Sequence, residues 1–341
     1  MYYVGIISGR DKRKADGDCE ELDVEINELL RRFGCGFSPE IQVTPFRSEE
    51  DDSEYKAWKV VDGEKTYILK QAKGHEAEIY RSFFENEKFK QSAESVRASV
   101  PGIYGAVNCE GEDYLLMEYI EGMDLCKCDR SRLKLVLDAL ISLQDFYWET
   151  RISADIDCRA VDAGRCSEDD CSGLYAAGCS FADSLENRKR RGEYLNDPEL
   201  EAAYEKYLEV YQTVPRTLCH DDLLPFNVLV SDERAVIIDW EIVGMLPYPT
   251  SLARLIAHCS EDENAFFVMS EDDKNFAVEY YYDRLVRGKG ISEEEYRTTL
   301  DYFRLYEYCE WIMLGNRYED ADMDRFREYM GKAKELVKTW M

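Results

Sequence analysis

The sequence predicts a two-lobed α+β protein, and three observations indicate this class. The chain has 341 residues, more than a single hydrophobic core usually holds. Its first third alternates short extended segments with a helix, as small α+β units do. The remainder carries apolar residues mostly at helical spacing. We therefore expect a small lobe of antiparallel sheet with one helix at residues 1–120, and a larger, mostly helical lobe at residues 121–341.

The small lobe is predicted to begin with an extra helical segment within about residues 1–36, which ends near Gly34. The clearest local signal is Asp62-Gly63 between two apolar stretches, a pair typical of tight hairpins. The expected elements are, in order, strands at 41–46, 55–61 and 66–70, a helix from about 74, and strands at 103–107 and 114–119.

The larger lobe is predicted from helical periodicity. Leu133, Val136, Leu137 and Leu140 recur at the spacing that places side chains on one face of a helix. The expected elements are helices at 131–148 and 198–212, a loop or broken helix at 153–184, a strand-and-loop region at 218–239, and helices from 251 onward with breaks near 288–290 and 315.

The charge balance limits the classes of partner. The formal net charge is −28, with 43 Lys and Arg against 71 Asp and Glu. Binding to nucleic acid needs cationic side chains that neutralise phosphates, so we expect no nucleic-acid partner. A cationic ligand would be attracted by such a field, although the charge could equally serve solubility alone.

Cysteine and histidine usage indicates a reducing compartment. The twelve cysteines are scattered and form no C-x-x-C pair, so we interpret them as reduced thiols, and with only three histidines we expect no structural zinc site. Two of the histidines, His220 and His258, are expected to be structural. The sequence shows neither a run of about 18 apolar residues nor a signal-peptide pattern, so we expect no membrane partner and a cytoplasmic location.

The strongest functional signal lies between residues 219 and 241. The apolar stretches 228–230 and 236–238 flank a polar turn and predict a hairpin, which would bring Asp239 back beside Asn227. Carboxylate and amide oxygens suit Mg²⁺, which shares its coordination with substrate phosphates. The carboxylate of Asp222, five residues before Asn227, is then left to hold an attacking hydroxyl. An ordinary acidic turn and hairpin is the alternative interpretation.

The order His220-x-Asp222-x-x-x-x-Asn227, followed by Asp239, resembles the signature of the protein-kinase-like superfamily. Trp240-Glu241 stand where protein kinases have Phe-Gly, which is similar to the aminoglycoside phosphotransferase and choline kinase branch. The resemblance extends from about residue 41 to the C-terminal helices. It implies a protein-kinase-like fold, with Asp222 as the catalytic residue and with Asn227 and Asp239 as Mg²⁺ ligands.

The activity that this resemblance implies is transfer of the γ-phosphoryl group of a nucleotide, ATP or GTP, to a hydroxyl of an amino sugar or amino alcohol. A kinase of choline or of another small metabolite is an alternative. A catalytically silent nucleotide-binding protein on the same fold is another, and the acidic turn described below favours it slightly.

Lys70 closes an apolar strand and can meet nucleotide phosphates as a point charge. Glu76 shares the inward helix face of Ile79 and Phe83, whereas Glu78 falls on the opposite side, so Glu76 is the expected partner of Lys70. A solvated lysine at a strand end is the alternative for Lys70 considered alone.

Residues 116–122 resemble the kinase hinge. The resemblance implies that Met117 lines the adenine pocket, and that Glu118 and Ile120 offer a backbone carbonyl and N–H to the base.

The expected phosphate loop departs from the kinase pattern. No G-x-G-x-x-G precedes Lys70, and the first hairpin turn, 47–54, is acidic and free of glycine. Ser48 or Ser53 is therefore expected to supply backbone N–H contacts to the phosphates.

Acceptor binding is predicted from acidic and aromatic side chains, which could hold an ammonium group by charge and cation–π contacts. Core aromatics and a solvated acidic face are the alternative. The candidate acceptor-binding residues are Glu241, Glu307, Glu310, Trp311 and Tyr318.

Overall fold

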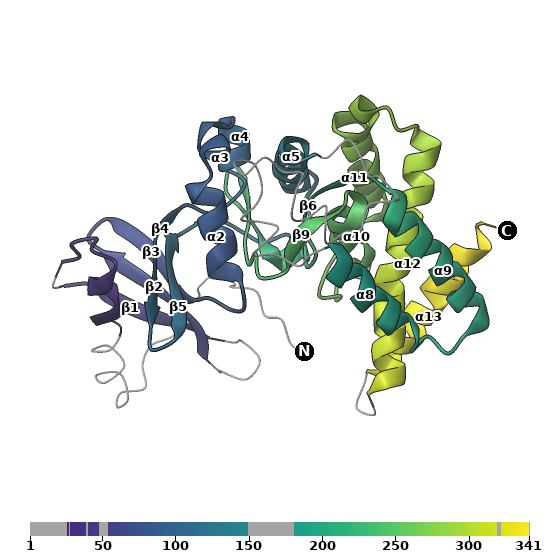
Figure 1. Ribbon diagram of the computed structural model, residues 1–341, viewed down its shortest axis with the longest axis horizontal. Helices are drawn as coiled ribbons and strands as arrows, with labels where there is room; N and C mark the ends of the chain where they lie inside the picture. The colour runs from purple at the N-terminus through teal and green to yellow at the C-terminus, as the bar shows by residue number, and fades with distance from the viewer. Residues whose placement is uncertain are drawn as a thin grey trace.

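The computed structural model describes residues 26, 28–38, 40–47, 54–148, 181–318 and 322–340, in two connected regions (Figure 1). An antiparallel sheet occupies the N-terminal region, and the larger remainder is mostly helical, so the predicted α+β class is confirmed. The short β6–β9 pair lies between the sheet and the outer helices in Figure 1. The division between residues 120 and 121 stays a prediction.

Five antiparallel strands form the sheet in the order β1-β2-β3-β5-β4. Gly63, at φ 61°, makes the turn of the predicted β2–β3 hairpin, a left-handed conformation that glycine adopts without strain. Lys70 of β3 lies opposite Ala57 of β2 and Leu115 of β5, near the middle of the sheet. The strands are β1 Gln42–Arg47, β2 Glu54–Asp62, β3 Lys65–Gln71, β4 Ile103–Cys109 and β5 Glu112–Glu118.

The two faces of the sheet have different partners, because successive side chains of a strand alternate. Leu69 and Leu116 are fully buried on one face, against Leu30 of the helical residues 28–32. That short helix is the described part of the predicted N-terminal segment. Lys70, one residue along from Leu69, therefore points to the opposite face, where α2 (Glu76–Glu85) packs.

Two helices were not predicted in this region. The chain turns after α2 into α3 (Glu87–Gln91), because the side chain of Asn86 accepts a hydrogen bond from the backbone N–H of Phe89 at 3.0 Å and starts a new helix. The helix α4 (Glu94–Arg97) follows and packs on α5. The expectation of a single helix before residue 120 is therefore wrong in detail.

The helical region is built around α12, which packs on α9, α10 and α13. The predicted break near 288–290 is present as a short 3-10 turn that ends at Gly290, at φ 80°. The predicted break at Gly315 is wrong, because α12 continues through it to Arg317. The helices are α5 Arg130–Phe146, α8 Phe181–Gly192, α9 Pro198–Thr213, α10 Pro249–Ala257, α11 Glu271–Arg284, α12 Glu293–Arg317 and α13 Met323–Lys338.

Two short strand pairs carry the region that the sequence singled out. The strand β6 (Arg216–His220) pairs with β9 (Val243–Pro247), and both are buried along their whole length. Between them β7 (Val228–Val230) and β8 (Ala235–Ile237) form the predicted hairpin. Among the described helices, none is long and apolar enough to cross a bilayer.

Candidate active site

The loop after β6 is held in place by a buried histidine. The Nε2 atom of His220 lies 3.0 Å from the carbonyl oxygen of Ile238, and its Nδ1 accepts a hydrogen bond from the backbone N–H of Asp222 at 3.3 Å. Burial lowers the pKa of His220 to about 4, so its imidazole is neutral at physiological pH. The ring packs against Trp240, with centroids 4.9 Å apart. His220 therefore joins the two ends of the hairpin region, which matches the expected structural role.

The hairpin places two oxygen-bearing side chains together on the wall of one cleft. The backbone N–H of Ile238 donates to the carbonyl of Asn227 at 3.0 Å, and Asp239 then turns with φ 62°. The Nδ2 of Asn227 donates to the carbonyl of Asp222 at 2.8 Å, which leaves its Oδ1 as the atom available to a ligand. Asn227 and Asp239 both line the cleft. An amide oxygen and a carboxylate fit the oxygen-ligand preference of Mg²⁺.

Lys70 contacts Asp239 across the cleft. Its Nζ lies 2.6 Å from Oε1 of Glu76 and 2.5 Å from Oδ1 of Asp239. Burial alone would lower the pKa of Lys70, but the two carboxylates outweigh burial and raise it. Burial would likewise raise the pKa of Asp239, yet the charge of Lys70 holds it below its ordinary value. The lysine is therefore charged and its position is defined by two anions.

The partner of Lys70 is the glutamate on the inward helix face. Glu76 is fully buried, and its second oxygen accepts a hydrogen bond from the backbone N–H of Lys73 at 3.3 Å. Glu78 is exposed and lies 2.9 Å from Nδ1 of His75. The helix periodicity thus gave the correct pairing.

The cleft has a volume of about 610 Å³ and is bounded by the sheet and the hairpin region. Of the predicted nucleotide-binding residues, Lys70, Met117, Glu118 and Ile120 line it. Ser48 and Ser53 lie outside the described residues, so their predicted phosphate contacts stay a prediction. Glu118 also has a structural role, because its Oε2 accepts from the backbone N–H of Gly102 at 3.0 Å.

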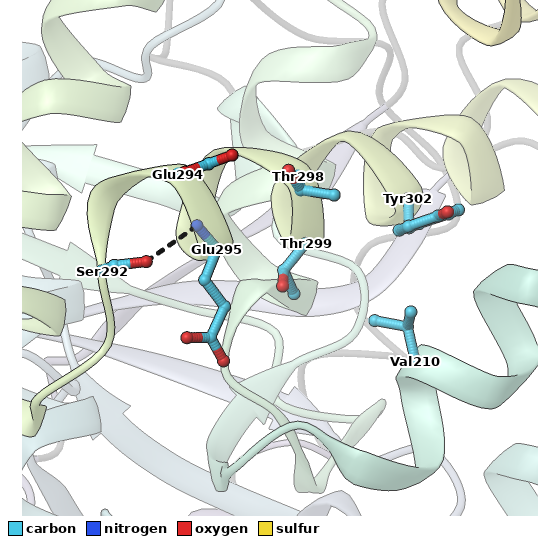
Figure 2. A pocket seen from close by; sticks show the side chains of 7 residues that line it. All are labelled: Val210, Ser292, Glu294, Glu295, Thr298, Thr299 and Tyr302. Atoms are coloured by element: carbon cyan, nitrogen blue, oxygen red, sulfur yellow. Dashed lines mark hydrogen bonds between the residues drawn. The ribbon is translucent and has the colours of Figure 1, made fainter. Parts of the chain in front are cut away.

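A second hollow, of about 400 Å³, lies elsewhere (Figure 2). It lies at the start of α12, where the side chain of Ser292 accepts from the backbone N–H of Glu295 at 3.2 Å and caps the helix. None of the predicted site residues lines it. The cleft is therefore the candidate site. The lining residues of the hollow are Val210, Ser292, Glu294, Glu295, Thr298, Thr299 and Tyr302.

Asp222 is buried, and Arg254 is its one cationic partner among the described residues. Its Oδ1 accepts hydrogen bonds from Nη2 of Arg254 at 2.7 Å and from Nε of Arg254 at 3.1 Å. Its Oδ2 is buried without a hydrogen-bond partner in the described part of the chain. Burial raises the pKa of Asp222 to about 6 against the opposing charge of Arg254.

Two of the predicted acceptor residues are connected to Asp222 through that arginine. Nη1 of Arg254 donates to Oε2 of Glu307 at 2.8 Å and to Oε2 of Glu310 at 2.5 Å. Glu310 also pairs with Arg191. Glu307 is only 2% exposed, so it does not belong to a solvated acidic face.

The other three acceptor candidates are not joined to Asp222 by these contacts. Trp311 stacks on Tyr329, with ring centroids 5.7 Å apart. Tyr318 is exposed just beyond the end of α12. Glu241 lies 3.6 Å from Nζ of Lys73. The acceptor-binding roles of all five residues stay predictions.

The sequence analysis missed Arg254, although a signal was present. The helix α10 is apolar except for Arg254 and the residues at its ends, and His258 follows four positions later, one turn along the same face. An arginine inside an otherwise buried helix needs anionic partners, because an unpaired buried charge is costly. The signal was sufficient to predict buried partners, but not to identify them.

The sheet with α2 packed on it, the loop that carries Asp222 and the Lys70–Asp239 contact together define a kinase-like fold. The family model described as the phosphotransferase enzyme family matches residues 42–280. The chain belongs to this family.

Among curated proteins, the chain is similar to protein LicA of Haemophilus influenzae, with 22% identity over 133 residues. This match covers 38% of the chain and 46% of LicA, so the chain spans less than half the length of this relative.

Two solved structures show the same fold. Aminoglycoside 2′-phosphotransferase-IIIa in complex with GDP has a TM-score of 0.56 at 13% identity, and covers 94% of this chain and 100% of its own. A Ralstonia eutropha protein assigned to the aminoglycoside phosphotransferases has a TM-score of 0.55 at 14% identity, and covers 93% and 98%.

Proposed function

We propose that the protein is a small-molecule kinase, which transfers the γ-phosphoryl group of ATP or GTP to a hydroxyl of an amino sugar or amino alcohol. The observation that carries this proposal is the meeting of Lys70, from the sheet, with Asp239, from the hairpin, inside one cleft. Asn227 lines the same wall, and its amide is bonded to the backbone of Asp222. The GDP complex of a protein with the same fold supports a nucleotide in this cleft.

In the proposed reaction, the acceptor oxygen bonds to the γ-phosphorus while the bond to the β–γ bridging oxygen breaks. The nucleoside diphosphate leaves, and the proton of the acceptor hydroxyl passes to Asp222. Lys70, which Glu76 holds in the cleft, neutralises charge on the phosphates. Asn227 and Asp239 would hold Mg²⁺, which would supply further neutralisation of phosphate charge when bound. The protein's contribution is thus positioning and electrostatics.

The acceptor class rests on the charge around Asp222. Three carboxylates, of Asp222, Glu307 and Glu310, face two guanidinium groups, of Arg254 and Arg191, which leaves one net negative charge. Such a surplus favours a cationic acceptor over an anionic one. Amino sugars and amino alcohols, choline among them, satisfy this condition.

A screen of acceptors tests the proposal. The purified protein is incubated with Mg²⁺ and either ATP or GTP, and with amino sugars, choline and small amino alcohols, and phosphorylated products are detected by mass spectrometry. We expect turnover that Asp222→Asn abolishes. Nucleotide binding without any product, and with no difference between wild type and Asp222→Asn, would instead support a silent nucleotide-binding protein.

A further inference from the structure

Two neighbouring aspartates in the catalytic loop are held in different ways. Nη2 of Arg188 lies 2.7 Å from Oδ1 and 3.0 Å from Oδ2 of Asp221, so both oxygens of that carboxylate are occupied. Arg254 directs two nitrogens, Nη2 and Nε, at the same oxygen of Asp222. One oxygen of Asp222 is thereby fixed, and among the described residues none donates to the other.

The second carboxylate oxygen of Asp222 is in an energetically unfavourable environment. Oδ2 of Asp222 is buried and has no hydrogen-bond partner among the described residues. A buried carboxylate oxygen without a hydrogen-bond donor is costly, so such an atom is usually paired or awaits a ligand. A hydroxyl that donates its hydrogen would satisfy it.

Arg254 is itself fixed without help from Asp222. Its Nη1 is held by Glu307 and Glu310, which belong to α12, at 2.8 and 2.5 Å. Glu310 is held in turn by Arg191 and by the hydroxyl of Tyr306, the latter at 2.9 Å. The guanidinium therefore has anchors that are independent of Asp222.

The helix that carries Arg254 is also attached to the catalytic loop. The side chain of Ser251 in α10 accepts from the backbone N–H of His220 at 3.0 Å and donates to its carbonyl at 3.2 Å. The distance between Arg254 and Asp222 is thus set by contacts at both ends, and little movement is available between them.

We infer that Arg254 is a positioning residue for phosphoryl transfer, which holds Oδ1 of Asp222 so that Oδ2 receives the hydrogen of the acceptor hydroxyl. This inference rests on the proposed role of Asp222 as the proton acceptor. Arg254 does not line the nucleotide cleft. Its loss should therefore lower kcat and leave the affinity for nucleotide unchanged.

The test compares Arg254→Lys with Arg188→Lys. Both variants keep a positive charge beside a buried aspartate, but only Arg254 bonds to Asp222 itself, whereas Arg188 bonds to Asp221. The assay measures ADP release in the presence of Mg²⁺ and ATP. Water is the acceptor in a first series, and any acceptor found by the screen is added in a second. For Arg254→Lys we expect kcat to fall roughly 10- to 100-fold, because a small misplacement of a reacting group causes losses of this size. KM for ATP should be unchanged. For Arg188→Lys we expect kcat to change by less than about threefold.

The outcomes separate this inference from the proposed function. Wild-type kcat in a folded Arg254→Lys, or equal losses of kcat in both variants, would overturn the positioning role. Turnover that survives Asp222→Asn would overturn the role of Asp222 as the proton acceptor, whereas a wild type that binds nucleotide but forms no phosphorylated product would overturn the proposed function itself. If Arg254→Lys does not fold, Glu307→Gln serves instead, because it weakens the anchor of Arg254 while keeping an acceptor atom.

For Glu307→Gln the expected loss in kcat is about 3- to 10-fold, the difference between a charged and a neutral hydrogen bond. KM for ATP should again be unchanged. A folded Glu307→Gln with wild-type kcat would overturn the positioning role.

Discussion

Lys70 bonds to two carboxylates at very different distances along the chain. Glu76 is six residues away, and Asp239 is 169 residues away. The first contact follows from helix periodicity and could be predicted from sequence. The second depends on how the sheet meets the hairpin, and the sequence indicated it only through the resemblance of both segments to kinase motifs. Arg254 had no such motif and was missed, because its three anionic partners lie 32 to 56 residues away.

Asp239→Asn should abolish turnover and leave the fold intact. One lysine faces two carboxylates, so removing the charge of Asp239 leaves Lys70 and Glu76 as a balanced pair. Because Lys70 favours the charged form of Asp239, we expect an unchanged or slightly lower melting temperature. We also expect a loss of activity of at least about 10³-fold, the scale of lost phosphate-charge stabilisation. Thermal melting and turnover are measured together, with Asp232→Asn in the exposed hairpin turn as control. An active, folded Asp239→Asn would contradict the assignment of a metal ligand.

His220 should make stability depend on pH. Its pKa is about 4 in the folded protein and about 6.5 in the unfolded chain, so the unfolded state takes up the proton first as pH falls. The contribution of neutral His220 to the free energy of unfolding is fully present above about pH 6.5. It is lost as pH falls toward 4, and the loss is on the order of 3 kcal/mol.

Urea unfolding at several pH values tests this dependence. His220→Gln should be less stable than wild type at pH 7.5 and should show a shallower decline between pH 6.5 and 4. His75→Gln, at an exposed histidine, should keep the wild-type slope. Parallel slopes for His220→Gln and wild type would show that His220 does not titrate as stated.

At the scale of elements, the strands of the sheet and the β7–β8 hairpin could be predicted within about two residues, because alternation and turn residues are local signals. The prediction failed at Gly315, where packing against a distant part of the chain, and not the local conformation, requires the residue. Gly315 was interpreted as a helix break, but a Cβ there would lie 2.3 Å from the ring of Phe326 on α13. The glycine therefore permits two helices to approach closely, and sequence periodicity alone does not distinguish that role from a break.

Gly315→Ala and Gly331→Ala should have opposite effects. Alanine is the better helix former by about 1 kcal/mol. At Gly331 in α13 a Cβ would have open space, so that variant should be more stable by about that amount. At Gly315 the clash with Phe326 should outweigh the gain and lower stability by roughly 1–3 kcal/mol. Urea unfolding measures both, and a stabilised Gly315→Ala would refute the close approach of α12 and α13.

At the scale of the whole molecule, the sequence predicted the α+β class and the family correctly, since one motif and the order of elements sufficed. It did not predict how the net charge of −28 is distributed. Around Asp222 the carboxylates are largely compensated by arginines, which composition cannot show. Cytoplasmic location and the lack of a nucleic-acid partner stay predictions.

The field of the whole protein should act selectively on a cationic acceptor. The Debye length falls from ~10 Å at 0.1 M to ~3 Å at 1 M ionic strength, so long-range attraction is screened over that range. KM for a cationic acceptor should rise several-fold at saturating nucleotide, whereas KM for a neutral analogue should change little. Steady-state kinetics with both acceptors at both salt concentrations measures this. Equal effects of salt on KM for the cationic and the neutral acceptor would mean that the net negative charge of the protein serves solubility alone.

Gly122, the last residue of the hinge-like segment, has a consequence for movement. A Cβ on Gly122 would lie 2.7 Å from the carbonyl oxygen of Val230, and Met123 and Val230 exchange two backbone hydrogen bonds, of 2.9 and 2.8 Å. These contacts hold residues 122 and 123 against Val230 at the end of β7, which lies three residues beyond Asn227. When the cleft opens, the pivot should fall at residues 119–121, and the sheet should swing away as one body. The Lys70–Asp239 bond and the Lys73–Glu241 pair would then be among the contacts that break, so their rupture would report the open state of the cleft.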